Sequence, residues 1–119
     1  MSNNEIKIYG IKACDTMKKA INWLDSESID YTFHDYKKLG IEEPKLREWL
    51  TQIEWSELIN RRGTTWRKLS DEQKTDVDND AAVKLMLENQ SLIKRPLLEK
   101  GGQIFLGFKP EYYASIFSN

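Results

Sequence analysis

The sequence has one cysteine, almost no excess of one charge over the other, and no long apolar run. A single cysteine, Cys14, cannot form an internal disulfide, and Met17 stands where the second cysteine of a C-x-x-C redox pair would follow. No apolar run approaches the roughly 20 residues that cross a bilayer. The opening MSNNEIK lacks the basic and apolar segments of a secretory signal. We therefore expect a protein of the reducing cytoplasm that has no contact with a membrane.

The charge balance and the histidine content exclude two further kinds of site. The 18 basic and 19 acidic residues leave a net charge of −1, so no overall field attracts nucleic acid. No DNA-reading motif is present, and we expect no direct binding to nucleic acid. The only histidine, His34, lies in an alternating pattern and is predicted to be a packing or surface residue. No group of potential ligands has the spacing of a metal site.

The first 36 residues predict a strand, a helix and a second strand. Apolar side chains alternate in IKIY, residues 6–9, and Gly10 ends this run. Apolar residues then recur at helical spacing and predict a helix to about Ser26: Met17, Ala20, Ile21 and Leu24. IDYTFHDY, residues 29–36, alternates again and is rich in aromatic side chains. Such a crossover favours two parallel strands.

Helical signals dominate the middle of the chain, from Pro44 to about Asn89. Pro44 suits a first helical turn, and apolar residues follow it at helical spacing: Leu46, Trp49, Leu50 and Ile53. Further along, Ser70 and Gln73 resemble a capping box. Asp80 is predicted to cap a helix with the sequence AAVKLMLEN.

Strand signals return towards the C-terminus. LIKRPLL and QIFLGF, residues 92–98 and 103–108, flank Gly101 and Gly102, which suit a tight hairpin turn. Pro110 then predicts the start of a last short helix. Three of its side chains are available for packing: Tyr112, Tyr113 and Ile116.

The order β-α-β, helical block, β-β-α predicts an α/β fold. Two parallel strands and an antiparallel hairpin make a mixed four-stranded sheet with helices on its faces. This is the thioredoxin-like arrangement, with a helical insertion at about 42–89 between parts at about 5–40 and 90–119. Because no repeat or linker interrupts the chain, we expect one domain over residues 1–119. No interface pattern is evident, so we expect a monomer.

Cys14 falls between the first predicted strand and the first predicted helix. Backbone N–H groups at a helix start have no intrahelical partner and favour the thiolate over the thiol. Lys12, Lys18 and Lys19 add positive charge nearby. The alternative is a small buried apolar residue, which is the commoner role of a lone cysteine. The residues alone leave both interpretations open.

Arg95 and Pro96 form the second candidate feature. A proline within an apparent strand must lie at an edge, a bulge or a special turn. In a thioredoxin-like sheet the loop before the third strand faces the cysteine loop, and a cis Pro96 would set its shape. Arg95 would then direct its guanidinium towards the thiolate. An ordinary surface arginine before a turn is the alternative.

The stretch NRRGTTWRKL, residues 60–69, is basic and is predicted to be a loop. Its three arginines are Arg61, Arg62 and Arg67, which suit a carboxylate, a phosphate or an acidic tripeptide such as glutathione. Equally, they suit a solvent-exposed face whose positive charge balances the acidic stretch DEQKTDVDND, residues 71–80. No G-x-x-x-x-G-K-[ST] pattern is present, so this is not a phosphate-binding loop of that kind.

Four stretches together resemble the ArsC family of arsenate reductase-like proteins: IYGIKACDTMKKA, IDYTFHDYKK, LINRRGTTWRKL and LIKRPLL. Their order and spacing match over nearly the whole chain and are most similar to the YffB-like subgroup. The resemblance implies a thioredoxin-like domain with a nucleophilic cysteine at Cys14. In the arsenate reductases of the family the thiolate attacks arsenate, glutathione attacks the adduct, and glutaredoxin regenerates the thiol.

The chain departs from the family pattern in the residues that bind the oxyanion. Three arginines bind the oxyanion in those reductases, and the one before the proline carries over to Arg95. Asn60 stands at the second position, beside Arg61 and Arg62, and the third has no counterpart, since Lys109 is the nearest cation after Arg95. We therefore expect a glutathione-dependent thiol reductase, and do not expect arsenate to be its natural substrate.

The predicted site assigns catalysis to Cys14 and Arg95. Substrate binding is assigned to five residues: Lys12, Arg62, Thr64, Thr65 and Pro96. We expect no metal and no tightly bound cofactor, with glutathione as co-substrate and glutaredoxin as a further partner. The alternative is a regulator, because Spx-like members of the family bind RNA polymerase without turnover. Many of those carry a C-x-x-C switch that this chain lacks.

Overall fold

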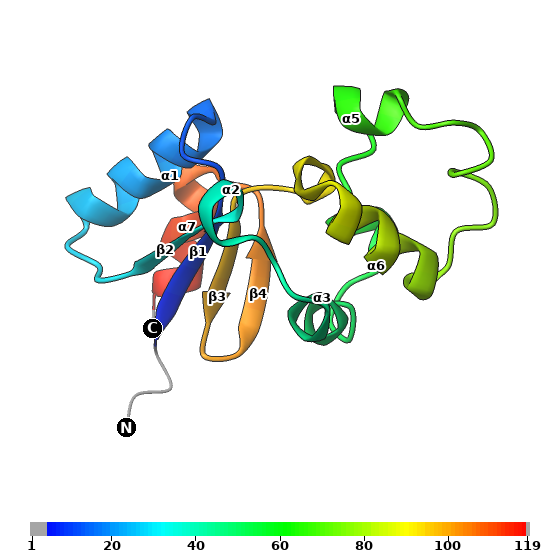
Figure 1. Cartoon of the computed structure of the whole chain (residues 1–119). Helices are drawn as coiled ribbons and strands as arrows, with labels where there is room; N and C mark the ends of the chain where they lie inside the picture. The colour runs from blue at the N-terminus through cyan, green and yellow to red at the C-terminus, as the bar shows by residue number, and fades with distance from the viewer. Residues whose placement is uncertain (1–4, 119) are drawn as a thin grey trace. The chain divides into compact units, whose positions relative to one another are not determined.

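The computed structural model describes residues 5–118; residues 1–4 and 119, the ends of the predicted single domain, lie outside the described part (Figure 1). The chain divides into two compact units. Unit 1 comprises the residues up to Leu39 and those from Arg95 onward, and unit 2 comprises Gly40–Lys94. The predicted insertion of about 42–89 falls inside unit 2, and the single domain over 1–119 stays a prediction.

Unit 1 contains a mixed four-stranded sheet in the order β2-β1-β3-β4. Its strands are β1 (Ile6–Gly10), β2 (Thr32–Asp35), β3 (Leu97–Lys100) and β4 (Gln103–Leu106). β1 pairs in parallel with β2, whereas β3 is antiparallel to both of its neighbours. The predicted thioredoxin-like α/β fold is therefore confirmed.

Two helices cover the same face of this sheet: α1 (Asp15–Ser26) and α7 (Pro110–Phe117) (Figure 1). The apolar stripe predicted for α1 is confirmed, because its side chains join a buried cluster with the sheet and α7. The cluster consists of Ile6, Ile8, Met17, Ala20, Leu24, Leu98 and Tyr113. A Cβ atom on Gly10 would overlap the Met17 sulfur, so this glycine lets α1 approach β1.

The ends of unit 1 differ from the prediction in detail. β2 ends at Asp35, and Tyr36 already belongs to the short helix α2 (Tyr36–Leu39), because the Asp35 carboxylate accepts a hydrogen bond from the Lys37 N–H at 2.9 Å. The hairpin turn is confirmed, with Gly101 and Gly102 both at positive φ. The packing expected of Tyr112 is confirmed in part, since its ring lies 6.4 Å from the Phe105 ring while the residue is 38% exposed.

Unit 2 consists of short helices around its own buried cluster. The helices are α3 (Glu43–Trp49), α4 (Trp55–Leu58), α5 (Thr64–Arg67), α6 (Asn79–Glu88) and the 3₁₀ helix η1 (Gln90–Leu92). The fully buried side chains include Leu46, Trp49, Leu58, Ile59, Met86, Leu92 and Ile93. An isolated antiparallel bridge joins Ile59 to Ile93 and ties the segment after α4 to the segment after η1.

Two predictions for unit 2 are wrong, and a third is confirmed in part. Residues 60–69 are not all loop, since they contain α5. The capping box is confirmed, because the Ser70 N–H donates to Gln73 Oε1 and the Gln73 N–H donates to Ser70 Oγ. The residues that follow, 71–74, form turns and not a helix, because this polar stretch has no apolar stripe to bury. α6 is capped by Asp78, whose carboxylate accepts from the Ala81 N–H at 2.9 Å, and not by Asp80.

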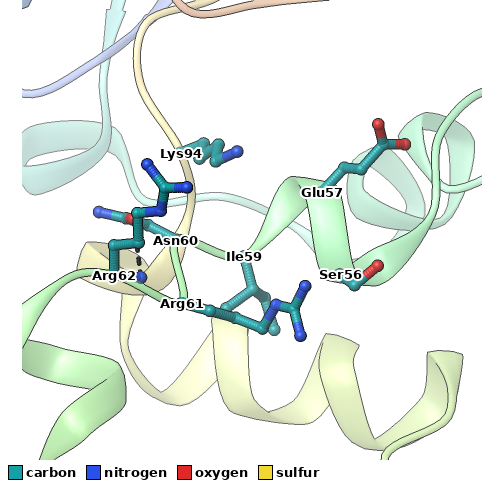
Figure 2. Close-up of a pocket in the computed structure, with 7 residues that line it drawn as sticks. All are labelled: Ser56, Glu57, Ile59, Asn60, Arg61, Arg62 and Lys94. Atoms are coloured by element: carbon teal, nitrogen blue, oxygen red, sulfur yellow. Dashed lines mark hydrogen bonds between the residues drawn. The ribbon is translucent and has the colours of Figure 1, made fainter.

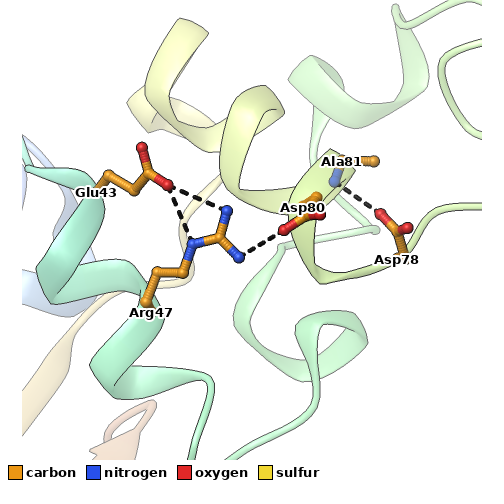
Figure 3. Close-up of polar contacts among 5 residues, drawn as sticks. All are labelled: Glu43, Arg47, Asp78, Asp80 and Ala81. Carbon is orange, nitrogen blue, oxygen red and sulfur yellow. Dashed lines mark hydrogen bonds and ion pairs between the residues drawn. The ribbon is translucent and has the colours of Figure 1, made fainter.

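Asp80 instead belongs to a surface network between α3 and α6 (Figure 3). The Arg47 guanidinium lies 2.6 Å from Asp80 Oδ1 and 3.1 Å from Glu43 Oε2. These side chains are exposed, so the network orients the two helices within unit 2 and contributes little stability. Within the described residues no helix is long and apolar enough to cross a membrane.

Candidate functional site

Cys14 is the N-cap residue of α1, with an extended backbone that turns the chain from β1 into the helix. Its N–H donates to the Ile11 carbonyl at 3.1 Å, and its own carbonyl accepts from the Lys18 N–H at 3.0 Å. The predicted position between strand and helix is confirmed. Cys14 is half-buried and packs against the unit 1 cluster.

The sheet register brings the cysteine loop and the proline loop to the same end of unit 1. Tyr9 lies opposite Leu97, so the residues after Tyr9 lead towards Cys14 where Pro96 leads into β3. The Arg95–Pro96 peptide bond is cis, as predicted. The Gly107 N–H donates to the Pro96 carbonyl at 3.0 Å and so ties the proline to the end of β4.

A tyrosine–glutamate network occupies the sheet face opposite α1 and α7. The Tyr9 hydroxyl donates to Glu99 Oε1 at 3.0 Å, and the His34 ring lies 4.9 Å from the Tyr9 ring. His34 therefore packs, in agreement with the prediction. No group of metal ligands exists among the described residues.

Tyr36 and Arg95 lie within electrostatic reach of each other at this end of the sheet. Burial raises the pKa of Tyr36 well above 10; the neighbouring Tyr9 and Glu99 add to the rise, and the Arg95 guanidinium opposes it. Arg95 itself is half-buried. It is thus placed beside a buried phenol at the cysteine end of the sheet, and not on an open surface turn.

The sequence analysis missed Tyr9, Tyr36 and Glu99. Strand alternation could have shown which sheet face Tyr9 and Glu99 occupy, because it places every second side chain on one face. It could not have shown that the two side chains are neighbours, because that depends on the register of β1 with β3, which joins residues 90 positions apart.

The residues assigned to the site fall in both units. Lys12, which is exposed, shares the loop of Cys14, and Arg95 with Pro96 lies at the same end of the sheet. Unit 2 contains the other three: Arg62, Thr64 and Thr65. Arg62 and Thr64 are exposed and Thr65 is half-buried, the two threonines forming the first turn of α5.

Arg62 also lines a cavity of about 550 Å³ within unit 2 (Figure 2). The other lining residues are Ser56, Glu57, Ile59, Asn60, Arg61 and Lys94. The basic stretch of the sequence therefore contributes to a hollow surface.

Comparison with known proteins places the chain in a family. The ArsC family pattern matches residues 9–116. The chain belongs to the ArsC family. Among solved ArsC-like structures, one named YFFB protein is 51% identical, with a TM-score of 0.91 over 95% of this chain and 99% of that one. An arsenate reductase (ArsC) related protein from Brucella melitensis is 49% identical, with a TM-score of 0.78 over 97% and 96%.

Curated relatives of this ArsC-family chain include an uncharacterized protein of Haemophilus influenzae. It is 40% identical over 113 residues, which cover 95% of this chain and 99% of the relative. The global transcriptional regulator Spx 1 of Lactococcus lactis is 26% identical over 89% of this chain and 84% of that protein. A glutaredoxin from Archaeoglobus fulgidus shares the fold alone, with a TM-score of 0.50 at 17% identity over 98% and 88%. The predicted ArsC resemblance is confirmed.

Proposed function

We propose that this ArsC-family chain is a thiol oxidoreductase in which Cys14 is the nucleophile and glutathione supplies the second thiol. The observation that carries the proposal is the half-buried Cys14 at the N-cap of α1, at the sheet end where cis Pro96 leads into β3. A sulfur beside unpaired backbone N–H groups is favoured as thiolate, which is the attacking species. The relationship to proteins named arsenate reductase supports thiol chemistry.

The single cysteine determines the reaction sequence. The Cys14 thiolate attacks the glutathione sulfur of a mixed disulfide between glutathione and a substrate thiol. The S–S bond breaks, the substrate leaves as a thiolate that takes a proton from water, and Cys14 becomes joined to glutathione. A second glutathione thiolate then attacks that sulfur, releases Cys14 as thiolate and yields oxidised glutathione. The net reaction converts one mixed disulfide and one reduced glutathione into the free substrate thiol and one oxidised glutathione.

Arg95 and Lys12 supply positive charge in this proposal. The Arg95 guanidinium stabilises the negative charge on the sulfur and on the departing thiolate. Lys12 assists from the same loop as Cys14, and Pro96 shapes the substrate position. Arg62, Thr64 and Thr65 hold glutathione. The reaction takes place in the cytoplasm, with the chain as a monomer.

Arsenate is not the substrate we propose. No arginine follows Arg95, and Asn60 stands at the second arginine position of the family pattern. Each missing charge-assisted contact to the oxyanion costs about 1.5–3 kcal/mol.

A Cys14→Ser variant tests the proposed chemistry. We expect wild-type protein to reduce a glutathione mixed disulfide and the variant to lose this activity entirely, because a hydroxyl does not form the disulfide intermediate. The substitution is nearly isosteric, so its circular dichroism spectrum and its melting temperature should match those of the wild type. Unchanged turnover in the variant would exclude Cys14 as the nucleophile.

The relationship to Spx 1 favours one alternative, a regulator that binds RNA polymerase without turnover. Purified RNA polymerase distinguishes the two functions. A regulator binds the polymerase in pull-down and shows no reductase activity, whereas the proposed enzyme turns over mixed disulfides and does not bind.

A further inference from the structure

The charged side chains of unit 1 are divided between the two ends of its sheet. Four exposed acidic residues lie at the end where β1 begins and α1 finishes: Glu5, Asp25, Glu27 and Asp30. Six exposed lysines lie at the opposite end, where β1 leads into Cys14: Lys12, Lys18, Lys19, Lys37, Lys38 and Lys109. We call these six residues the lysine face. The nearly balanced charge of the whole chain therefore conceals a polar unit 1.

The direction of the strands brings the lysine face together. β1 and β2 are parallel, so α2, which follows β2, lies at the same end of the sheet as the loop that follows β1. β4 ends opposite the start of β3, and β3 starts opposite Tyr9, so Lys109 also lies at this end. Figure 1 shows α2 and the start of α1 beyond the same end of β1.

The ammonium groups of the lysine face are available to a ligand. Among the described residues, the lysine and arginine side chains in ion pairs are Lys45 and Arg47, and neither belongs to the lysine face. The cation–π contacts in the same part of the chain engage three other side chains: Arg61, Lys74 and Lys100. An anionic partner of the lysine face would therefore displace no ion pair.

Few acidic side chains oppose this positive charge. Asp15 and Glu111 are exposed at the same end of unit 1, whereas Asp35 is buried and accepts a hydrogen bond from the Lys37 N–H at 2.9 Å. Arg95 adds a further, half-buried cation. The cations outnumber the acids, so this end of unit 1 attracts anions.

Cys14 lies within the lysine face. Lys12 precedes it by two residues, and the Lys18 N–H donates to the Cys14 carbonyl at 3.0 Å, one helical turn along α1. Residues four apart on a helix have Cβ atoms about 5–6 Å apart. This separation is shorter than the Debye length of roughly 8 Å at physiological salt, so the charge of Lys18 acts at Cys14.

The width of the lysine face selects the class of ligand. β2 and β4 are the edges of a four-stranded sheet, so the strand ends that precede Lys37 and Lys109 lie about 14 Å apart. A single phosphate or carboxylate is too small to reach both edges. An extended polypeptide covers the same distance with about four residues. Nucleic acid has the charge, but it has no thiol for the proposed reaction.

We propose that the lysine face docks an acidic segment of a protein, and that the substrate disulfides of Cys14 are those flanked by aspartate and glutamate. The carboxylates of that segment would contact the lysines on both sides of Cys14 and hold the substrate sulfur beside the thiolate. This proposal rests on the proposed function for the chemistry at Cys14, and it adds the class of substrate.

Binding is measured without chemistry by fluorescence anisotropy, with labelled, cysteine-free peptides and the full-length chain. At about 0.1 M salt, we expect a Glu-rich peptide to bind about tenfold more tightly than a Gln-rich peptide of equal length, because several exposed ion pairs form. The advantage should disappear at about 1 M salt, where the Debye length is about 3 Å. Equal affinities of the two peptides at the lower salt concentration would overturn the proposal.

Single-charge variants locate the binding surface. Lys18→Gln and Lys37→Gln should each weaken binding of the Glu-rich peptide about twofold. Gln103→Glu is the matched control, because it makes the same change of charge at an exposed residue where β4 starts, at the opposite end of the sheet. Equal weakening by all three variants would overturn the proposal. So would a single-stranded oligonucleotide of equal charge that binds as tightly as the Glu-rich peptide.

Peptides that carry a glutathione mixed disulfide test the substrate preference. Each rate is divided by the rate with β-mercaptoethanol, a small thiol that has no other charge. At about 0.1 M salt, we expect kcat/KM for a Glu-flanked cysteine to exceed that for a Lys-flanked cysteine about tenfold or more. Lys37→Gln should lower this ratio and Gln103→Glu should not. A ratio of one in the wild type would contradict the preference.

The two proposals fail in different ways. If the Glu-rich peptide binds through the lysine face but no peptide disulfide is reduced, the proposed function fails and the docking surface stands. If the peptide disulfides are reduced at equal rates and the Glu-rich peptide has no advantage in binding, the lysine face assignment fails and the proposed function stands. Selective binding together with faster reduction of the Glu-flanked disulfide supports both.

Discussion

Two buried tyrosines of unit 1 have hydroxyl groups without a hydrogen-bond partner among the described residues, namely Tyr36 and Tyr113. Burial raises the pKa of both phenols above the ordinary value of 10. An unpartnered buried hydroxyl costs free energy that a phenylalanine ring avoids. The two differ in place, because Tyr36 lies near Arg95 and Tyr113 lies in the cluster between α7 and the sheet.

We expect Tyr36→Phe and Tyr113→Phe to be as stable as the wild type or more stable at pH 7, in urea unfolding. Above about pH 10 the unfolded tyrosines lose their protons before the folded ones, so the wild type loses stability as pH rises. Each substitution should reduce that slope. A loss above about 1 kcal/mol at pH 7 would mean that the hydroxyl is hydrogen-bonded in solution.

Arg95 is the residue whose electrostatic role is most directly measurable. We expect iodoacetamide to alkylate wild-type Cys14 faster than Cys14 of Arg95→Ala at pH 7, because the variant lacks the cation that the proposed function places near the thiolate. Arg95→Lys should partly restore the rate. An equal alkylation rate in Arg95→Ala would make Arg95 a structural residue.

Helices of two or more turns, and strands in which apolar and polar residues alternate, were predictable from the sequence. The stripe in α1, the alternation in β1 and the glycine pair of the hairpin each reflect burial on one face, which local sequence records. α4 and α5 have four residues each, too few for a periodic pattern. Helices this short form because tertiary packing holds them.

Two aspartates at the start of α6, Asp78 and Asp80, can be compared to show which of them caps the helix. We expect Asp78→Ala to lower the free energy of unfolding by about 0.5–2 kcal/mol, because the Ala81 N–H loses its acceptor. Asp80→Ala should cost about 0–1 kcal/mol, since it removes only an exposed ion pair with Arg47. Urea unfolding of both variants measures the difference. The reverse order would identify Asp80 as the cap that the sequence suggested.

At the scale of the whole molecule, the residues assigned from the sequence lie in both units: Cys14, Arg95 and Pro96 in unit 1, and Arg62, Thr64 and Thr65 in unit 2. The predicted fold was enough to place Cys14, Arg95 and Pro96 at one end of a sheet. The cavity around Arg61, Arg62 and Lys94 could not be predicted, because it depends on a bridge between segments more than 30 residues apart. The local pattern of residues does not indicate such a contact.

A single thiol per chain makes every disulfide of this protein intermolecular. We expect oxidised glutathione to attach one glutathione to each wild-type chain, and excess reduced glutathione to remove it. The Cys14→Ser variant should acquire no glutathione. Intact mass spectrometry measures both. No adduct on folded wild type, with labelling only after unfolding, would mean that the sulfur is inaccessible and would contradict the proposed function.

The order of strands in unit 1 has a consequence for the newly made chain. β1 is a central strand, with β2 on one edge and β3 on the other, yet β3 is made only after all of unit 2. Until Leu97–Lys100 leaves the ribosome, one edge of β1 has no partner strand from its own sheet. For most of its synthesis the nascent polypeptide therefore presents an open edge to other chains, and a translation arrest before Leu97 would release a fragment prone to aggregation.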